Sequence, residues 1–298
     1  MNGTEDSLIR LLVSQWTSRC GLVVGPGDDC AVVNGSSTGE QVLMKIDAIV
    51  EDVHFTRDMP AFSVGRKALA RVISDFAAMG AQPSAALISI SVPENIPATF
   101  LKNAYRGMNR LACKYHIALA GGETTKGGDL SFTVAAIGFS RRGKLVLRSG
   151  AFAGDLIFVT GSLGGSFPKH HLTFHPRVKE GLWLAENRAS AMMDLSDGLG
   201  KDLPRLAEAS NLSFQIHPEK IPRRPKCSLE HAVNDGEDYE LLFTVSQCDA
   251  PKLRATWPFH TRLTEIGIML PSGHDPVTGD IPFHGYDHFE KIGIGGSG

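Results

Sequence analysis

Apolar and polar residues follow two periodicities along this chain. Strict alternation, with a period of two, predicts strands over 41–50 and 84–93, and Pro93 closes the second. Apolar residues spaced three and four apart predict amphipathic helices over 62–81 and 97–116. Shorter patterns predict further strands over 30–33, 117–125, 130–140, 156–160, 190–194 and 238–246, and further helices over 5–16 and 202–210. The chain therefore alternates strands and helices over most of its length.

The order of these elements indicates the fold class. The pattern of strands and helices restarts after a linker near 143–150, which predicts an N-terminal domain over 1–143 and a C-terminal domain over 144–298. Strands in the first part follow one another as in hairpins. This order favours an α+β fold with a mixed sheet over a doubly wound parallel sheet.

Composition excludes several classes of protein. The 298 residues are 42% apolar and 21% charged, with a formal net charge of −2, so no general attraction to nucleic acid or anionic membrane is expected. The five cysteines are widely spaced and include no C-x-x-C, which argues against a disulfide framework and a zinc cluster. No apolar run approaches the roughly 20 residues of a membrane span, and the N-terminus does not resemble a signal peptide. These features predict a cytoplasmic protein.

Two stretches resemble phosphate-binding loops by letters alone. The segment 138–145 (GFSRRGKL) nearly matches a P-loop, but Leu145 stands where Ser or Thr would hold magnesium, and a hairpin turn is the better interpretation. The terminal GIGGSG fits G-x-G-x-x-G, but nothing follows it. A nucleotide site in this chain must therefore use other residues.

Acidic residues recur where predicted strands and helices end. Asp29 follows a Gly-Pro turn, where turn chemistry is the simple explanation. Asp47 shares one face of its strand with Lys45, which a solvated face would also explain. Asp75 lies at the edge of the apolar arc of helix 62–81, where a carboxylate is partly desolvated unless it reaches solvent or an internal arginine.

Further acids follow in the same kind of position. Asp194 ends a strand and Asp197 precedes a helix, where it could simply be an N-cap. Glu123 stands between a glycine pair and two threonines, a composition that an ordinary loop also has. Glu237 comes just before an apolar strand. Oxygen ligands without His or Cys select hard cations, so these acids together predict Mg²⁺ and, through it, a polyphosphate substrate.

With these residues in place, the sequence resembles the thiamine-monophosphate kinase family, a branch of the ATP-binding superfamily related to aminoimidazole-ribonucleotide synthetase. The matching stretches occur in family order over nearly the whole chain: GDDCAVV, DAIVEDVHF, KALARVISDFAAMGAQP, AGGETTKGG, RSGAFAGDLIFVTGSLG, MMDLSDGL, GEDYELLF and GYDHF. The resemblance implies two α+β domains, an active site in the cleft between them and a homodimer built through the N-terminal sheets. It also implies Mg²⁺-dependent transfer of a phosphoryl group from ATP to thiamine monophosphate, giving thiamine diphosphate.

The resemblance also assigns roles to residues. It implies catalytic roles for Asp29, Asp47, Asp75 and Asp194, and metal binding by these four together with Glu123 and Asp197. It places Gly122, Glu123, Arg148 and Ser196 at ATP, and His54, Glu237 and Phe283 near thiamine monophosphate. For Arg148 a surface arginine in a linker is the alternative, and for Phe283 a phenylalanine of the core.

Three departures from the family pattern leave other functions open. Lys45 and Ile46 stand where the family usually has hydroxyl residues before Asp47, and Glu123 stands where it has aspartate. Lys45 could replace part of the charge of one cation. The alternatives are a sister enzyme with the same ATP cleft and a degenerate nucleotide-binding homologue with a regulatory role.

Overall fold

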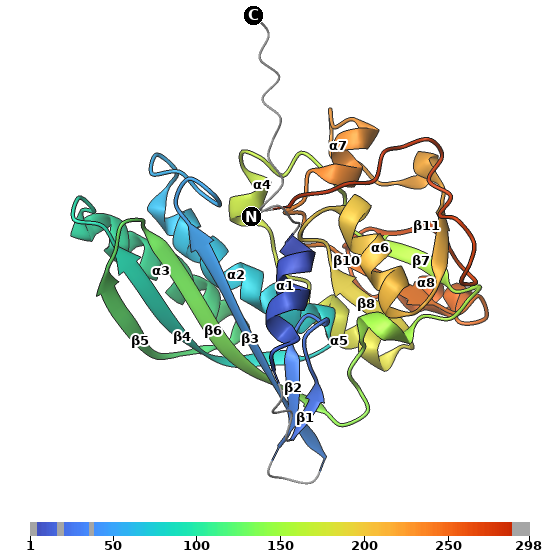
Figure 1. Cartoon of the computed structure of the whole chain (residues 1–298), viewed down its shortest axis with the longest axis horizontal. Coiled ribbons are helices and arrows are strands. Elements are labelled where there is room, and N and C mark those ends of the chain that lie inside the picture. Colours follow the sequence, from blue (N-terminus) through green and yellow to red (C-terminus); the bar gives the residue numbers. More distant parts are fainter. Residues whose placement is uncertain (1–4, 17–20, 36–38, 288–298) are drawn as a thin grey trace, which may run out of the picture.

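The computed structural model describes residues 5–16, 21–35 and 39–287. Two β-sheets stand on either side of a central helix, α2 (Ala61–Ala78), and the N-terminal helix α1 (Glu5–Val13) lies near the junction between the two halves (Figure 1). Cys20, the GIGGSG tail and part of the loop predicted between the first two strands lie outside the described residues.

The first sheet has six strands, in the order β1-β2-β3-β6-β4-β5. Its strands are β1 (Leu22–Val24), β2 (Ala31–Asn34), β3 (Glu40–Val50), β4 (Gln82–Val92), β5 (Ala118–Lys126) and β6 (Ser131–Arg141). All neighbours are antiparallel except β4 and β5, which are parallel and joined through α3 (Ala98–Tyr115). The sheet is therefore mixed, as the order of the predicted elements indicated.

Helices α2 and α3 pack closely on one face of this sheet, and two glycines permit the approach. A Cβ atom at Gly65 of α2 would lie 1.9 Å from the carbonyl oxygen of Ala104. One at Gly107 of α3 would lie 1.9 Å from the carbonyl oxygen of Phe62. Since a side chain at either position would overlap backbone, the sequence must keep glycine on both helices.

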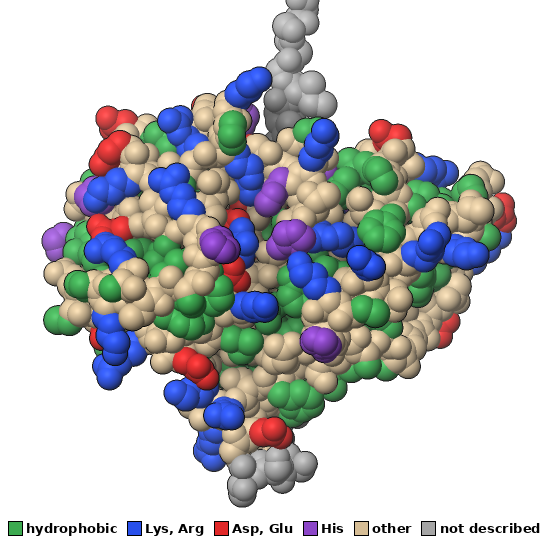
Figure 2. Space-filling view, turned by 180° about the vertical axis from the view of Figure 1, so that it is seen from behind, with side chains coloured by type: hydrophobic (Ala, Val, Ile, Leu, Met, Phe, Trp, Pro, Cys, Tyr) green, Lys and Arg blue, Asp and Glu red, His purple; other side chains and the backbone are tan. Residues whose placement is uncertain are grey.

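The other face of the six-stranded sheet carries apolar side chains that none of the described helices and strands covers. Met44 and Ile46 of β3 are 41% and 65% exposed, and Leu87, Ile137 and Phe139 from the neighbouring strands are also exposed. We call these five apolar residues the outer face. By contrast, α3 on the opposite side of the sheet presents basic side chains, and Figure 2 shows Lys and Arg scattered over that side.

The second sheet is antiparallel throughout, with the order β8-β10-β7-β11-β9. Its strands are β7 (Leu156–Thr160), β8 (Ala191–Asp194), β9 (Ser213–Ile216), β10 (Leu241–Val245) and β11 (Leu263–Leu270). Its helices are α4 (His170–Thr173), α5 (Val178–Glu186), α6 (Leu199–Ala209), α7 (Leu229–Asn234) and α8 (Ala250–Thr256), with 3₁₀ turns at Arg148–Gly150 and Pro218–Lys220. The predicted α+β class is confirmed, with one mixed and one antiparallel sheet.

The core does not stop at the predicted boundary near residue 143. One cluster of buried side chains joins Phe76 of α2 to Phe158 and Phe243 of the second sheet, and a second cluster lies within the C-terminal half. Helix α2 is buried from both sides because it packs against β3 and β6 as well as α5 and β8. The position of Asp75 on this helix places it between the two sheets.

Some local predictions were wrong. Helix α1 ends at Val13, three residues before the predicted end, and the turn after β6 leads into irregular chain instead of a second hairpin strand. The strands β1, β9 and β11 were not predicted, because they are short or lack clear alternation. Within the described ranges, no helix is long and apolar enough to cross a membrane.

Candidate active site

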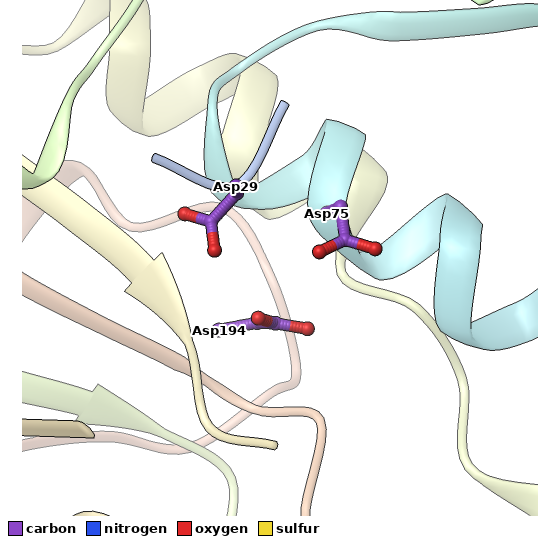
Figure 3. Close-up of side chains that lie close together, drawn as sticks. All are labelled: Asp29, Asp75 and Asp194. Atoms are coloured by element: carbon purple, nitrogen blue, oxygen red, sulfur yellow. The ribbon is translucent and has the colours of Figure 1, made fainter. Parts of the chain in front are cut away.

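Three buried aspartates meet where the two halves of the chain join. Oxygen atoms of Asp29, Asp75 and Asp194 lie within 4.8 Å of one another, and Figure 3 shows the three side chains around one common space. They are 2%, 7% and 3% exposed. We call these three residues the acid cluster.

Each member is placed by a different element. Asp29 comes from the turn before β2, where its N–H donates to the carboxylate of Asp28 at 3.0 Å. Asp75 lies in the last turn of α2. Asp194 ends β8 and accepts a hydrogen bond from Ser74 of α2. Residues 46 and 119 positions apart thus converge only in the folded chain.

Without a bound cation, ionisation of all three carboxylates in the acid cluster is unfavourable. Burial and the neighbouring Asp29 raise the pKa of Asp194 to about 6. Burial also raises the pKa of Asp75, although Lys45 opposes the shift. Like charges at about 4 Å repel by roughly 4 kcal/mol at an effective dielectric near 20, so cations are needed to keep the acid cluster ionised.

The chain supplies two such cations itself. The Lys45 ammonium of β3 lies 2.6 Å from Asp75, and the Arg148 guanidinium bonds to Asp29. Burial lowers the pKa of Lys45, but Asp75 and Asp47 outweigh it, so the net shift is upward and the ammonium stays charged. Arg148 is only 19% exposed at its side chain, which excludes the alternative of a surface arginine in a linker.

The acid cluster fits a divalent metal ion. The Oδ2 atom of Asp29 is buried and has no hydrogen-bond partner among the described residues, which is costly for a carboxylate oxygen. Every potential ligand in the acid cluster is a carboxylate oxygen, the ligand type that Mg²⁺ prefers. An ion bound there would satisfy both the open oxygen and the excess negative charge.

A cavity of about 520 Å³ opens next to the acid cluster. A smaller one, of about 60 Å³, shares its wall at His54, Arg71, Ser196, Asp197 and Tyr239. Both cavities are lined by residues from before and after residue 143. The site therefore lies between the two halves.

Five predicted residues line the larger cavity without belonging to the acid cluster: Asp47, His54, Arg148, Ser196 and Asp197. Asp47 is half-buried and forms an ion pair with Arg71 of α2 at 3.0 Å, so its carboxylate has an internal partner. Asp197 accepts from Arg205 at 2.6 Å, and Ser196 precedes it in the same turn. Helix α6 begins after Gly198, so Asp197 is not its N-cap.

The smaller cavity contains two of the predicted substrate residues. His54 accepts from the N–H of Val50 through Nδ1, and its carbonyl accepts from the fully buried Lys67. Lys67 also bonds to Glu237, whose carboxylate lies 3.2 Å from His171. Burial raises the pKa of Glu237, but these contacts and Arg71 outweigh it and lower the pKa to about 2, so the carboxylate is charged.

Other predicted residues lie elsewhere in this chain. Gly122 and Glu123 are on β5, an edge strand, and Glu123 accepts from the N–H of Thr124. Phe283 stacks on Phe214 at 5.7 Å within the second core cluster. None of these three lines either cavity in the described parts of the chain.

Sequence reasoning missed several residues of the site. Tyr286 and Phe167 line the smaller cavity, and Arg71 and Tyr239 line both. Tyr286 belongs to the GYDHF stretch that carries the family resemblance, and this was the available signal. Arg71 gave no signal because it lies among apolar helix positions.

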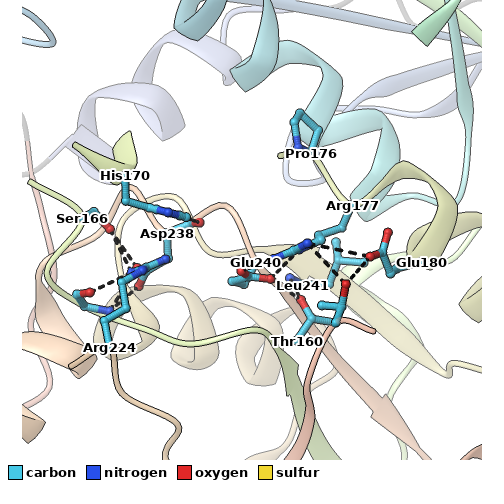
Figure 4. A network of polar contacts seen from close by, with 12 residues as sticks. Thr160, Ser166, His170, Pro176, Arg177, Glu180, Arg224, Asp238, Glu240 and Leu241 are labelled. Carbon is cyan, nitrogen blue, oxygen red and sulfur yellow. Dashed lines mark hydrogen bonds and ion pairs between the residues drawn. The ribbon is translucent and has the colours of Figure 1, made fainter. Parts of the chain in front are cut away.

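The acids after Glu237 play a different part. Asp238 accepts hydrogen bonds from the N–H of Gly164, the Ser166 hydroxyl and Arg224. Glu240 accepts from Thr160 and, through both oxygens, from Arg177 (Figure 4). We call Asp238 and Glu240 with their partners the anchor network, since it ties the segment before β10 to the rest of the second half.

Comparison with known proteins identifies the family. The chain is 35% identical to the thiamine-monophosphate kinase of Rhodopirellula baltica, over 89% of both chains. It is 33% identical to the Bacillus subtilis enzyme of the same name, over 96% of this chain and 99% of that one. The chain belongs to the thiamine-monophosphate kinase family. Residues 27–140 also match the model of the AIR synthase related protein, N-terminal domain.

Solved structures of family members have the same fold. AaThiL complexed with AMPPCP and TMP superposes with a TM-score of 0.83 at 30% identity, covering 96% of this chain and 97% of that one. The thiamine-monophosphate kinase of Stenotrophomonas maltophilia superposes with a TM-score of 0.75 at 30% identity, covering 92% and 95%. The two-sheet α+β architecture is thus the architecture of the family.

Proposed function

We propose that the two cavities bind ATP with Mg²⁺ and thiamine monophosphate, and that the protein transfers the γ-phosphoryl group of ATP to the monophosphate. The products are ADP and thiamine diphosphate. The observation that carries this proposal is the acid cluster, with its unpartnered Asp29 oxygen, beside a cavity between the two halves that Asp75 and Asp194 line. The AaThiL complex with AMPPCP and TMP supports it, because AMPPCP is an ATP analogue.

The two compartments suit different parts of the substrates. Two members of the acid cluster, Asp75 and Asp194, line the larger cavity together with Arg148 and Arg205, so it suits metal-bound phosphates. The smaller cavity is lined by Phe167, Tyr239 and Tyr286. Aromatic rings suit the flat, cationic thiazolium of thiamine. We therefore assign ATP to the larger cavity and the thiazolium ring to the aromatic side chains that line the smaller one.

The acceptor needs little activation by the protein. Its nucleophile is a phosphate oxygen that is already anionic at neutral pH, so no strong general base is required. The work of the chain is to hold the two phosphates in line and to neutralise the transferred group. Arg148 is positioned by Asp29 and its backbone N–H donates to Asp28 at 3.2 Å, so its guanidinium enters the site in a fixed orientation.

Magnesium would be held chiefly by the acid cluster. Bound there, it would supply positive charge that offsets the negative charge developing on the transferred phosphoryl group. Asp47 and Asp197 line the same cavity and are further candidate ligands. Glu123 stays a candidate for metal and Gly122 for ATP, as the resemblance implies. We assign catalytic roles to Asp29, Asp47, Asp75 and Asp194.

We also propose a homodimer formed through the outer face. Four of its five apolar residues, Met44, Ile46, Leu87 and Ile137, line a shallow depression of about 530 Å³ on the six-stranded sheet. A contiguous apolar surface of this kind is unusual on a monomer. We further propose that the chain has two domains, 1–143 and 144–298. Their contact is stabilised by the cluster of buried side chains that both contribute to.

One experiment tests the function directly. Release of ADP in a coupled assay should depend on both thiamine monophosphate and Mg²⁺, with thiamine diphosphate formed in equal amount. Thiamine and phosphorylated small molecules other than thiamine monophosphate serve as control acceptors. ADP formation with a control acceptor but not with thiamine monophosphate would instead favour a sister enzyme of the superfamily.

A further inference from the structure

Lys45 occupies an unusual place for a lysine. It lies on β3 with its side chain turned toward α2, 25% exposed, and its ammonium is 2.6 Å from the Oδ1 atom of Asp75. Asp75 is itself one of the three carboxylates whose oxygens lie within 4.8 Å of one another. The positive charge of a lysine side chain therefore lies directly beside one carboxylate of the acid cluster.

The side chain is held there by packing and charge. Its neighbours on β3 point alternately to the two faces of the sheet, so Lys45 and Asp47 face α2 while Met44 and Ile46 belong to the outer face. Asp47 forms an ion pair with Arg71 at 3.0 Å, and Asp75 is the carboxylate that the Lys45 ammonium contacts directly. The family resemblance places a hydroxyl residue here, which would offer an oxygen and no charge.

Charge in the acid cluster is partly matched by the chain. Among the described residues, two cations form ion pairs with the three carboxylates, Lys45 with Asp75 and Arg148 with Asp29, so one negative charge is left without an ion pair there. The open oxygen, Asp29 Oδ2, is on a different residue from the one that Lys45 contacts. A divalent ion at Asp29 and Asp194 is therefore compatible with Lys45, whereas another ion bound to Asp75 Oδ1 would have to lie against the ammonium.

We infer that the Lys45 ammonium takes the place of one divalent ion at Asp75, so that this chain binds one metal ion fewer than it would with a hydroxyl residue at position 45. This inference rests on the proposed Mg²⁺ site but not on the identity of the phosphate acceptor. Two consequences follow. The wild-type protein should need less free Mg²⁺ to bind nucleotide, and removal of the ammonium should open an additional metal site.

The test counts metal ions without turnover. Mn²⁺, which reports free ion by electron paramagnetic resonance, is titrated into the protein saturated with AMPPCP. Lys45→Thr should bind one additional Mn²⁺ per chain, whereas Lys45→Arg should keep the wild-type number. Lys220→Thr is the matched control, because it removes a lysine whose carboxylate partner, Glu265, lies outside the acid cluster. It should also keep the wild-type number.

The outcomes separate this inference from others. A folded Lys45→Thr protein that binds the wild-type number of Mn²⁺ would overturn it, and Lys45 would then only neutralise Asp75. If Lys45→Thr does not fold, as judged by circular dichroism and thermal melting, Lys45→Gln supplies an uncharged oxygen at similar length and must show the same gain. A gain of Mn²⁺ in a protein that fails to phosphorylate thiamine monophosphate would support the inference and reject the proposed function.

Discussion

The acid cluster and the anchor network both bury carboxylates, but they satisfy them differently. In the anchor network, Asp238 and Glu240 each accept hydrogen bonds from an arginine and from hydroxyl or backbone donors. In the acid cluster the carboxylates face one another, and one oxygen of Asp29 has no partner among the described residues. Saturated carboxylates stabilise a fold, whereas carboxylates left open and repelling one another keep a place for a ligand.

The largest expected effect comes from Asp75→Asn. This change removes one charge from the acid cluster and one candidate metal ligand while it preserves the shape of the side chain. We expect turnover to fall by at least about 10²–10³-fold, the scale of losing one preorganised electrostatic group, with the melting temperature nearly unchanged because carboxylate repulsion is relieved at the same time. The coupled ADP assay and thermal melting measure the two. Near-normal turnover would remove Asp75 from the metal set.

The matched change in the anchor network is Asp238→Asn, for which we expect the opposite pattern. Arg224 would lose its carboxylate partner in a largely buried place, and stability should fall by about 2–3 kcal/mol. Turnover per folded molecule should change little. Urea unfolding gives the free energy, and active-site titration with AMPPCP normalises the rate. If Asp238→Asn lowered turnover and left stability unchanged, the anchor network would have a functional role like that of the acid cluster, and the contrast between the two regions would be wrong.

A smaller effect is expected at Tyr286, which lines the smaller cavity, compared with Phe283, which packs on Phe214. Tyr286→Ala should raise KM for thiamine monophosphate by about tenfold with little change in kcat, since one aromatic contact of this kind contributes roughly 1–2 kcal/mol. Phe283→Ala should instead lower the melting temperature and leave KM near wild type. If Phe283→Ala raised KM and Tyr286→Ala did not, Phe283 and not Tyr286 would contact the substrate.

The smallest effect concerns pH and the edge of the anchor network. His170 bonds to the carbonyl of Asp238, and burial, together with the nearby Arg224, lowers the pKa of its imidazole to about 4. The unfolded chain takes up this proton near pH 6.5 but the folded chain does not, so stability is lost as the pH falls from 6.5 toward 4.

The measurement compares variants at two pH values. His170→Gln removes this titration, so between pH 7 and pH 5 it should lose about 1 kcal/mol less unfolding free energy than wild type, allowing for partial exposure. The exposed His260 supplies the control His260→Gln, which should follow the wild-type slope. Equal slopes for all three proteins would show that His170 titrates freely.

Much of the fold could be predicted from periodicity alone. Helices α2 and α3 and strands β3, β4 and β6 were expected within a few residues of their observed ends, because each is long and presents a consistent apolar face. The short strands β1 and β9 carry too few residues for a period to show, and α4 is a single turn. Local patterns fail where an element depends on its neighbours for stability.

The same division holds for the site. The sequence by itself determined that acids recur at the ends of elements in both halves, and the family motifs named Asp29, Asp75 and Asp194. Only the tertiary structure decided that these three share one space while Glu123 lies on an edge strand and Phe283 in the core. It also decided that Lys45 stands against Asp75. The physical reason is that a strand or helix fixes which face a side chain takes, whereas its partner on that face comes from a distant segment that only packing brings near.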